Sequence, residues 1–591
     1  MRAILFKRVS KCARLPSATN VMFKAIAVSK GRENDQLLSH PDPSTHMQSS
    51  LLGAIALMSG LFIQLLPPRP MTSGDWVGQI RVGDSSRFIR LRFGGDTAGR
   101  ADLPLEGRWG IRLTAFRRSD HALSFAVPVS GDTLVITTVV ASDSMSGSVE
   151  SHRGAGAFRA IHRMPYDMAL IRSLAGTYRI SADRELAMGP LDEASGWLAF
   201  FDTKTRRGGI LYALDDSTLF TGPSYGVDYP VVIRARIARS ASGEVAGLGW
   251  RESGRSAAFA RRNRDIHQED VVFHNGIVRL AGNITAPTSP GRHPAVVLIH
   301  GCCGSLPTRD FGYWSSYLAH HGIVVLAYDR RGGGASTGDP NSAYTDIADD
   351  VIAGVHVLEQ RPDVDADRVG VFGMSNGGYV APLAVTRANG HIAFVAVRSG
   401  SARRIGNNID YEVEGDLRSA GFSERDVARG VALRAHVTNF IVDHPTLTAI
   451  TWDSLQREVT AAQQEQWFGL ARVMWVPRVS VTDSGGLAYL NNLRSTWNYD
   501  PLPYWSRVRV PVYIMLGGLD RSVPTAESAP LLRAALARAG NTHATVRVFG
   551  TGNHGLMEAR TGFDSEARLL DRYVEGFQEG VVRWILGVTR P

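Results

Sequence analysis

Three residues that together could carry out nucleophilic catalysis lie far apart in the sequence. Ser375 is at the centre of a G-x-S-x-G pentapeptide, Asp520 follows the segment LGGL, and His554 lies in the segment GNHG. A serine hydroxyl attacks a carbonyl carbon well only when a neighbouring base takes its proton, and a carboxylate can orient that base. The three residue types therefore predict acyl transfer through a covalent intermediate on Ser375.

Each of these residues follows a run that is typical of a strand. The run VGVF at 369–372 leads into the pentapeptide, and a segment of helical character at 379–388 leaves it. A sharp turn between a strand and a helix exposes a serine hydroxyl, and Gly373 and Gly377 leave room for the two elements to pass closely. Asp520 comes just after the run 510–516 and His554 just after 544–549. We therefore expect all three side chains at strand ends.

The region 268–591 has the pattern of an α/β domain. Runs rich in valine and isoleucine at 294–299, 323–328, 369–372 and 393–397 alternate with helical segments at 344–360 and 380–388. This alternation predicts a parallel sheet that is covered on both faces. It stops at about 402–505, where 423–443 and 453–473 have helical spacing. We interpret this stretch as a helical cap inserted into the domain, because the run 510–516 resumes the sheet directly afterwards.

Two small all-β domains are expected before this region, at 71–165 and 170–264. Both contain short runs in which apolar residues alternate with polar ones, separated by Gly-Asp or Gly-Gly pairs, which is typical of antiparallel hairpins. The first opens with Gly74-x-Trp76 and the second, which we start at Leu174, has Gly176-x-Tyr178. Asp215-Asp216 could form an acid pair, but Ser217 beside it favours a hairpin turn. We expect these domains to be structural or to wall the substrate entrance.

Composition excludes several classes of protein. The chain has 591 residues, of which 44% are hydrophobic and 20% charged, as expected for a folded protein of several domains. The net charge of +9 is dispersed, and no basic block is interleaved with aromatic residues, so we expect no nucleic-acid partner. Three cysteines, Cys12, Cys302 and Cys303, are too few for a disulfide framework and lack zinc-site spacing.

The segment 1–70 is interpreted as a basic leader followed by a signal or anchor segment. Residues 51–66 are apolar and uncharged, and two prolines and an arginine follow them. This length suits a signal-peptide core or a marginal membrane anchor, which predicts an exported, periplasmic or membrane-anchored protein. Because a polar stretch precedes Met47, translation starting at Met47 is one interpretation. A buried helix is the alternative, and cleavage of the segment is left open.

The sequence HGCCG at 300–304 directly follows the strand expected at 294–299. In this position a loop can supply a backbone N–H to the oxyanion of an acyl-transfer intermediate, together with the N–H that follows the nucleophile. The donors we expect are the amides of Cys302 and Asn376. A redox or metal role for the adjacent cysteines is less favoured, because further ligands at suitable spacing are lacking.

Together these motifs resemble the α/β-hydrolase superfamily. The segments HGCCG, YDRRGGGASTGD at 328–339, GMSNGG, GGLDRSVP and NHG carry the resemblance, which covers about 270–591. They look like the bacterial esterase and serine-aminopeptidase-like branch, with some likeness to the catalytic domain of prolyl oligopeptidases. The chain order Ser375, Asp520, His554 is also typical of this superfamily. HGCCG is a departure, since many relatives carry glycine or serine after His-Gly.

The resemblance implies hydrolysis through an acyl-enzyme on Ser375, with His554 as base and then acid, Asp520 orienting it, and no metal or organic cofactor. We favour a small carboxylic ester or thioester as the substrate. A short peptide, cleaved by an aminopeptidase or oligopeptidase activity, is the alternative. The all-β region is too short for a seven-bladed propeller, which disfavours a true prolyl oligopeptidase. A non-catalytic binding protein on the same fold is less favoured, because every catalytic position is filled.

Residues of the cap bear on the choice between ester and peptide. An aminopeptidase usually holds the substrate's ammonium group with carboxylates, for which Glu412 and Glu414 are candidates, although acidic residues on a helix usually form a solvated face. The aromatic residues of the insertion instead suggest an apolar pocket. We expect Trp467 or Trp475 to influence which acyl group is preferred.

Overall fold

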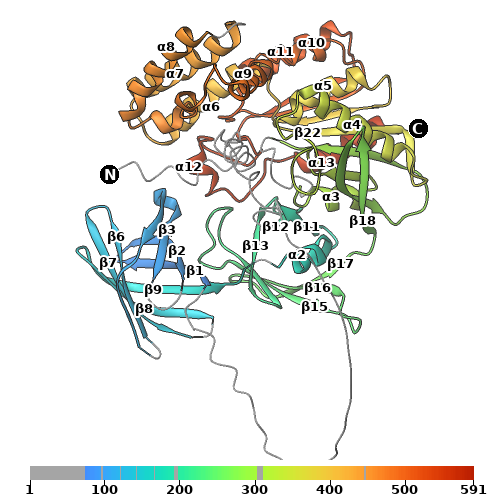
Figure 1. Cartoon of the computed structure of the whole chain (residues 1–591). Coiled ribbons are helices and arrows are strands. Elements are labelled where there is room, and N and C mark those ends of the chain that lie inside the picture. The colour runs from blue at the N-terminus through green and yellow to red at the C-terminus, as the bar shows by residue number, and fades with distance from the viewer. Residues whose placement is uncertain are drawn as a thin grey trace, which may run out of the picture.

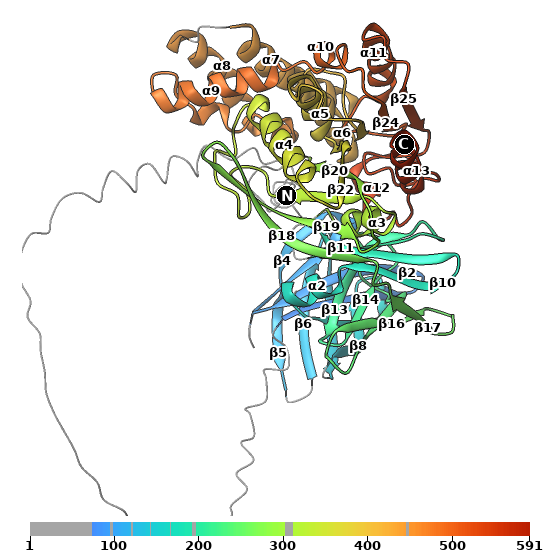
Figure 2. The same cartoon turned by 90° about the vertical axis from the view of Figure 1, so that its right-hand side faces the viewer.

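The computed structural model describes residues 74–94, 98–119, 122–141, 143–165, 167–191, 197–301, 311–444 and 448–590. Within these residues the chain forms three sheets in succession, two antiparallel and one mostly parallel. Figures 1 and 2 show the two antiparallel sheets at one end of the molecule and a group of helices at the other. The expected fold class, an α/β sheet with a helical insertion behind an all-β region, is confirmed. The limits of the domains stay predictions.

The first sheet has nine antiparallel strands in the order β4-β3-β2-β1-β9-β8-β7-β6-β5. Alternation along each strand buries one face; in β7, for example, Leu134 and Ile136 are buried while Val135 is exposed. The buried face forms a core around Trp76 and Phe125. The strands are β1 Gly74–Val82, β2 Ser85–Phe93, β3 Gly99–Leu103, β4 Arg108–Arg112, β5 Thr114–Arg118, β6 Ala122–Val129, β7 Asp132–Val140, β8 Ser144–Ser151 and β9 Gly154–Arg163.

The second sheet is a closed antiparallel barrel of eight strands, in which β17 pairs with β10. The Asp215-Asp216 pair lies in a hairpin turn as expected, because the Asp215 carboxylate accepts the N–H of Ser217 at 2.7 Å. The strands are β10 Gly176–Ser181, β11 Arg184–Leu191, β12 Trp197–Asp202, β13 Gly208–Asp215, β14 Thr218–Thr221, β15 Ile233–Arg239, β16 Val245–Glu252 and β17 Ala258–Arg262.

The opening of this barrel differs from the sequence prediction. Leu174 was expected to start a strand, but it ends the short helix α2 (Met168–Leu174). Asp167 caps this helix by accepting the N–H of Ala169 at 2.9 Å, which stabilises the helix start. Ile171 and Leu174 then pack into the barrel core. The segment is helical because it packs against the barrel, and the local alternation of apolar and polar residues does not reveal this contact.

The third sheet has the order β18-β19-β21-β20-β22-β23-β24-β25. Strands β18 and β19 form an antiparallel hairpin, β19 is antiparallel to β21, and the remaining pairs are parallel. Parallel strands require long crossover connections, and helices supply them. The strands are β18 Ile266–Asn275, β19 Val278–Pro287, β20 His293–Ile299, β21 Val324–Tyr328, β22 Val364–Met374, β23 Val395–Arg398, β24 Val512–Gly517 and β25 Ala544–Phe549.

Helices cover both faces of this sheet. Successive residues of β20 point to opposite faces: Val297 belongs to a core with α4 (Tyr344–Glu359), α5 (Gly377–Arg387) and α11 (Thr525–Arg538). Val296 belongs to a core with α3 (Trp314–His320) and α13 (Gln578–Val588). Burial on both faces explains why these strands read as continuous apolar runs. A further short helix, α12 (Asp564–Ala567), lies between β25 and α13.

The helical insertion lies between β23 and β24. The segment 453–473 was expected to be one helix, but α8 ends at Ala461, and 3-10 turns fold the following residues back so that Trp467 and Phe468 are buried. The insertion comprises α6 Ile405–Ser419, α7 Glu424–Asp443, α8 Ala449–Ala461, the 3-10 turns Ala462–Gln464, Phe468–Ala471 and Val476–Arg478, α9 Ser484–Trp497 and α10 Leu502–Trp505.

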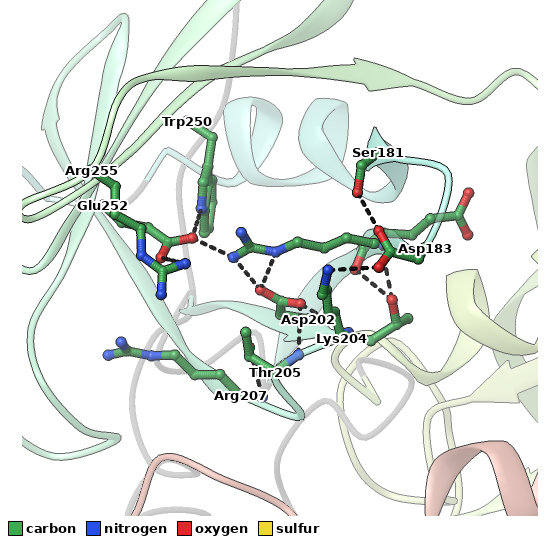
Figure 3. Close-up of polar contacts among 12 residues, drawn as sticks. Ser181, Asp183, Asp202, Lys204, Thr205, Arg207, Trp250, Glu252 and Arg255 are labelled. Carbon is green, nitrogen blue, oxygen red and sulfur yellow. Dashed lines mark hydrogen bonds and ion pairs between the residues drawn. The ribbon is translucent and has the colours of Figure 1, made fainter.

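A network of polar side chains fixes the hairpin between β12 and β13 (Figure 3). Asp202, which is 1% exposed, accepts the backbone N–H groups of Lys204 and Thr205 at 3.1 and 3.2 Å. Its other carboxylate oxygen accepts two hydrogen bonds from Arg184, at 2.9 and 2.6 Å. A buried carboxylate is tolerated only with such partners, so the hairpin is held in one shape.

This hairpin connects the barrel to the third sheet's domain. The N–H of Gly208 donates to the carbonyl of Asp571 at 2.8 Å, and the N–H of Tyr573 donates to the carbonyl of Arg206 at 2.9 Å. The guanidinium of Arg206 also binds the Glu558 carboxylate at 2.6 Å. The barrel therefore holds the segment 558–573, which follows β25.

None of the helices in the described ranges is both long and apolar enough to cross a membrane. The apolar run 51–66 lies outside those ranges, so export or anchoring through it stays a prediction.

Candidate active site

Ser375 lies on a strained turn between β22 and α5. Its backbone φ is 53°, a left-handed conformation that residues with a side chain rarely adopt outside functional turns. Glycines make the turn possible: a Cβ on Gly373 would lie 2.6 Å from the carbonyl oxygen of Gly377, and one on Gly377 would lie 2.6 Å from that of Ile299. The sequence therefore fixes a tight elbow that presents the Ser375 hydroxyl at the carboxyl edge of the sheet.

The structure brings the three predicted side chains together. Nε2 of His554 lies 3.0 Å from Oγ of Ser375, and Nδ1 of His554 lies 3.0 and 2.9 Å from the two carboxylate oxygens of Asp520. Residues 179 positions apart in the sequence are thus in hydrogen-bond contact. This is the arrangement in which a histidine can take the serine proton.

The Asp520 carboxylate is fixed by the loop after β24. The side chain is buried, and Oδ1 accepts the backbone N–H groups of Ser522 and Val523, both at 2.8 Å. Tyr411 of α6 donates its hydroxyl to the Asp520 carbonyl at 3.1 Å. The helical insertion therefore supports the loop that carries the carboxylate.

The environment raises the pKa of His554 above its ordinary value of 6.5. Burial is the largest single influence and lowers this pKa, but the charge of Asp520 and its hydrogen bond together outweigh it. Arg398 acts to lower the pKa and Glu412 acts to raise it. The carboxylate thus stabilises the imidazolium that would form when His554 takes a proton.

Of the two predicted oxyanion donors, the structure describes one. Asn376 precedes the first turn of α5, where backbone N–H groups and the helix dipole favour negative charge. Its side-chain amide donates to the hydroxyl of Tyr344 at 2.5 Å, which orients the turn. Cys302 lies outside the described residues. Gly301, two residues after β20, packs beside the nucleophile, since a Cβ there would lie 3.6 Å from Cβ of Ser375.

His300 is not a second base. Its ring is buried, and burial together with the charge of Arg330 lowers its pKa to about 3. The imidazole therefore stays neutral at physiological pH, and it packs against the ring of Tyr328.

The acidic residues of the insertion have partners. Glu412 binds Arg472 at 2.7 Å and accepts a hydrogen bond from Asn408 at 3.0 Å. Glu414 pairs with Arg418 along the same helix. Neither carboxylate is therefore an unpaired site for an ammonium group.

The two tryptophans expected to influence acyl preference pack within the helical insertion, and their effect on the substrate stays a prediction. Trp467 is 3% exposed and packs under Arg429, whose guanidinium lies 5.5 Å from the ring centre. Trp475 packs against Trp452 and Trp497. Trp467 thus belongs to the core of the insertion, and the partly buried Trp475 packs against that core.

Sequence reasoning missed two residues that touch the histidine loop. Arg398 ends β23, and its guanidinium donates to the carbonyl of His554 at 3.2 Å; the hydroxyl of Ser399 donates to the same carbonyl at 2.8 Å. The sequence signal that could have identified Arg398 is its place directly after the apolar run at 393–397, a strand that lies beside the one carrying the nucleophile.

The described part of the chain contains one grouping of possible metal ligands, made of His356, Glu359 and His391. Both imidazoles hydrogen-bond to Glu359 at 2.8 Å. The grouping lies at the C-terminal end of α4, which leads into the start of β22. It is therefore at the opposite end of that strand from Ser375.

Comparisons with known proteins match the region of the chain that carries these residues. The model of the alpha/beta hydrolase family matches residues 296–564. An uncharacterised peptidase, YtmA, of Bacillus subtilis is 29% identical over 160 residues, which are 27% of this chain and 60% of the relative. Esterase EstD of Thermotoga maritima is 29% identical over 167 residues, which are 26% of this chain and 39% of that enzyme.

An esterase of Pyrococcus furiosus with a solved structure aligns with 55% of this chain and 92% of its own, at a TM-score of 0.34 and 16% identity. The two curated relatives are matched over less than two thirds of their length. The family match spans the nucleophile turn, the carboxylate loop and the histidine loop. The region 296–564 therefore has the α/β-hydrolase fold, and its sequence is most like the esterase-like branch of that superfamily.

Proposed function

We propose that this protein is a serine hydrolase that cleaves small carboxylic esters or thioesters through an acyl-enzyme on Ser375. The observation that carries the proposal is the continuous contact from Ser375 through His554 to Asp520, built on a left-handed serine turn. A turn of this kind is costly and persists where function requires it. One relative is named as an esterase, which supports the same chemistry.

The first half of the reaction forms the acyl-enzyme. Oγ of Ser375 attacks the ester carbonyl carbon while Nε2 of His554 takes the hydroxyl proton, and the carbonyl oxygen becomes an oxyanion. The N–H of Asn376, with that of Cys302, would stabilise this oxyanion. The tetrahedral intermediate then expels the alcohol or thiol, which receives the proton from His554.

The second half releases the acid. Water takes the place of the alcohol, His554 removes a proton from it, and the oxygen attacks the acyl carbon. The C–O bond to Ser375 breaks, the proton returns to Oγ, and a carboxylic acid leaves. Asp520 remains ionised throughout and holds Nδ1 of His554 as the protonated nitrogen.

Hydrolysis of short peptides is the second candidate. Glu412 is close enough to affect the pKa of His554, as a carboxylate that binds a substrate amine would be. One relative is also named as a peptidase. However, Arg472 already occupies the Glu412 carboxylate, and an ammonium group would have to displace it. Ester cleavage is therefore the better supported function.

A matched substrate panel tests the proposal. The purified protein is assayed with p-nitrophenyl esters of increasing acyl length, acyl-CoA thioesters, and aminoacyl and dipeptidyl anilides. We expect kcat/KM for the best ester to exceed that for every anilide by at least about 100-fold, because an amide has a much poorer leaving group. If an anilide equals the best ester, and Glu412→Gln removes only the anilide activity, the peptidase function replaces the esterase function.

A further inference from the structure

Arg398 connects the two catalytic loops at the carboxyl edge of the sheet. It is the last residue of β23, which lies between β22 and β24. Its carbonyl accepts the backbone N–H of Ser375 at 2.8 Å, and its guanidinium Nη1 donates to the carbonyl of His554 at 3.2 Å. One residue therefore contacts the backbone of both the nucleophile and the base.

The surroundings of this guanidinium are three phenols and, farther away than a salt bridge, the Asp520 carboxylate, whose charge raises the pKa of Arg398. Tyr225, Tyr313 and Tyr573 all lie close enough to interact with its charge, and hydrogen bonds join Tyr573 to each of the other two. Gln578 donates to the hydroxyl of Tyr313 at 2.9 Å. Burial raises the pKa of all three phenols, so none carries a negative charge at physiological pH.

Within the described ranges, no carboxylate oxygen lies within 4.0 Å of the Arg398 guanidinium, and its Nε–H has no hydrogen-bond partner. Burial lowers the pKa of Arg398, yet a guanidinium stays protonated in proteins. A largely buried cation without a salt-bridge partner destabilises a fold. Its position between the nucleophile and the base gives a functional reason for its presence.

The barrel supplies one side of this phenol cluster. Tyr225 lies between β14 and β15, and its backbone N–H donates to the carbonyl of Leu570 at 3.0 Å. The next residue, Gly226, donates to the carbonyl of Arg568 at 2.9 Å. These bonds hold Tyr225 against the segment that follows the histidine loop. The side chain of Tyr225 thus connects the barrel to the surroundings of the catalytic residues.

We propose that Arg398 is a positioning residue, which holds the His554 loop against the nucleophile strand, and that Tyr225 of the barrel supports its guanidinium. This inference rests on the proposed serine hydrolysis. It also gives the barrel a role: through Tyr225 and the β12–β13 hairpin, the barrel maintains the geometry of the histidine loop.

The charge of Arg398 makes the role measurable. Among the residues that the structure describes, four groups act on the His554 imidazole: the Ser375 hydroxyl, the Asp520 and Glu412 carboxylates, and the Arg398 guanidinium. Both carboxylates raise the pKa of His554, and Arg398 lowers it. Removing the cation must therefore raise this pKa further. Because the base acts only when unprotonated, the acidic limb of the pH–rate profile should move to higher pH.

The test compares substitutions at two positions. Arg398→Met removes the charge at similar length, Arg398→Lys keeps the charge but not the planar fork, and Tyr225→Phe removes only a hydroxyl. For each variant, kcat, KM and the pH dependence of kcat/KM are measured with the best ester. Arg533→Met is the matched control, since Arg533 also donates to a backbone carbonyl, that of Val546, but is exposed on α11.

We expect Arg398→Met to lower kcat about 10- to 100-fold, as small misplacements of a catalytic group do, with KM changed less than threefold. Its acidic limb should move to higher pH. Arg398→Lys should restore the limb and part of the rate, Tyr225→Phe should lower kcat a few-fold, and Arg533→Met should match the wild type.

Several results would overturn the inference. One is an Arg398→Met variant with wild-type kcat and an unchanged acidic limb of its pH–rate profile. Another is an Arg398→Lys variant whose acidic limb shifts although the charge is retained. If Arg398→Met does not fold, Arg398→Lys and Tyr225→Phe decide, and unchanged kcat in both rejects the role. A wild-type enzyme without activity on any ester would instead reject the proposed function, so the two failures are distinguishable.

Discussion

Replacing Asp520 by asparagine should disable the base without changing the shape of the site. Oδ1 of Asp520 accepts two backbone N–H groups, from Ser522 and Val523, both at 2.8 Å. An asparagine must place its carbonyl oxygen there, because its NH2 group cannot accept a hydrogen bond. The NH2 group then occupies the position of Oδ2, which lies 2.9 Å from Nδ1 of His554.

This placement selects the wrong tautomer of the histidine. The asparagine NH2 donates to Nδ1, so the imidazole proton moves to Nε2, the atom that must accept the Ser375 proton. Loss of the correct tautomer costs on the order of 10⁴-fold in kcat. At about 1.4 kcal/mol per tenfold change, this equals roughly 5 to 6 kcal/mol of transition-state stabilisation.

The same substitution should move the pH profile. Asp520 raises the pKa of His554 above 6.5, while burial alone would lower it. Without the carboxylate, this pKa falls, and the remaining activity should extend to lower pH. The assay is kcat against pH for Asp520→Asn, with Asp349→Asn as control, since Asp349 is on α4 and pairs with Arg387. A fall in kcat of less than about tenfold, or an acidic limb that moves to higher pH, would show that Asp520 does not set the tautomer of His554.

Three further predictions concern stability. Gly377→Ala should lower the free energy of unfolding by about 1–3 kcal/mol, because its Cβ would lie 2.6 Å from a backbone oxygen of β20. The control is Gly587→Ala in α13, which has open space around it and should change the free energy of unfolding by less than about 1 kcal/mol. Thermal unfolding of both variants measures the difference, and equal values would contradict it. Trp467→Ala should cost about 3–5 kcal/mol through lost packing in the insertion yet leave the ranking of acyl esters unchanged, which the ester panel checks. Although burial alone would raise the pKa of Glu185, hydrogen bonds led by that from His320 lower it to about 2, below the ordinary value of 4.5. The stability that this carboxylate contributes is complete above about pH 4.5 and is lost as the pH falls toward 2, by about 1–3 kcal/mol. Urea unfolding across this window should show that Glu185→Gln lacks this loss; parallel curves for both proteins would count against it.

The candidate site could be predicted because its residues follow local patterns. Ser375 and Asp520 each come after a buried strand and His554 comes after the edge strand β25, and the carboxyl ends of parallel strands share one edge of a sheet. The glycines around Ser375 indicate the turn, since only residues without a Cβ fit between the strand and the helix. The alternation of apolar strand runs with helical segments likewise predicts that both faces of the sheet are buried.

Features that depend on contacts distant in sequence could not be predicted. Leu174 ends a helix because the helix packs into a barrel that closes about 90 residues later, where β17 meets β10. Arg398 reads as a charge at the end of an apolar strand, and only the folded chain shows it against His554 and three tyrosines. Trp467 was expected near a substrate pocket but lies in a core, since hydrophobicity alone does not say which surface a ring will cover.

The most direct test of the central claim is to locate the covalent bond. The wild-type protein and Ser375→Ala are incubated with a fluorophosphonate probe and with an activated ester, digested, and examined by peptide mass spectrometry, with ester turnover measured in parallel. We predict one labelled residue in the wild type, Ser375, and neither label nor turnover in Ser375→Ala, with a loss of turnover on the order of 10³-fold or more. Label on another residue, or turnover retained in a clean Ser375→Ala preparation, would contradict it.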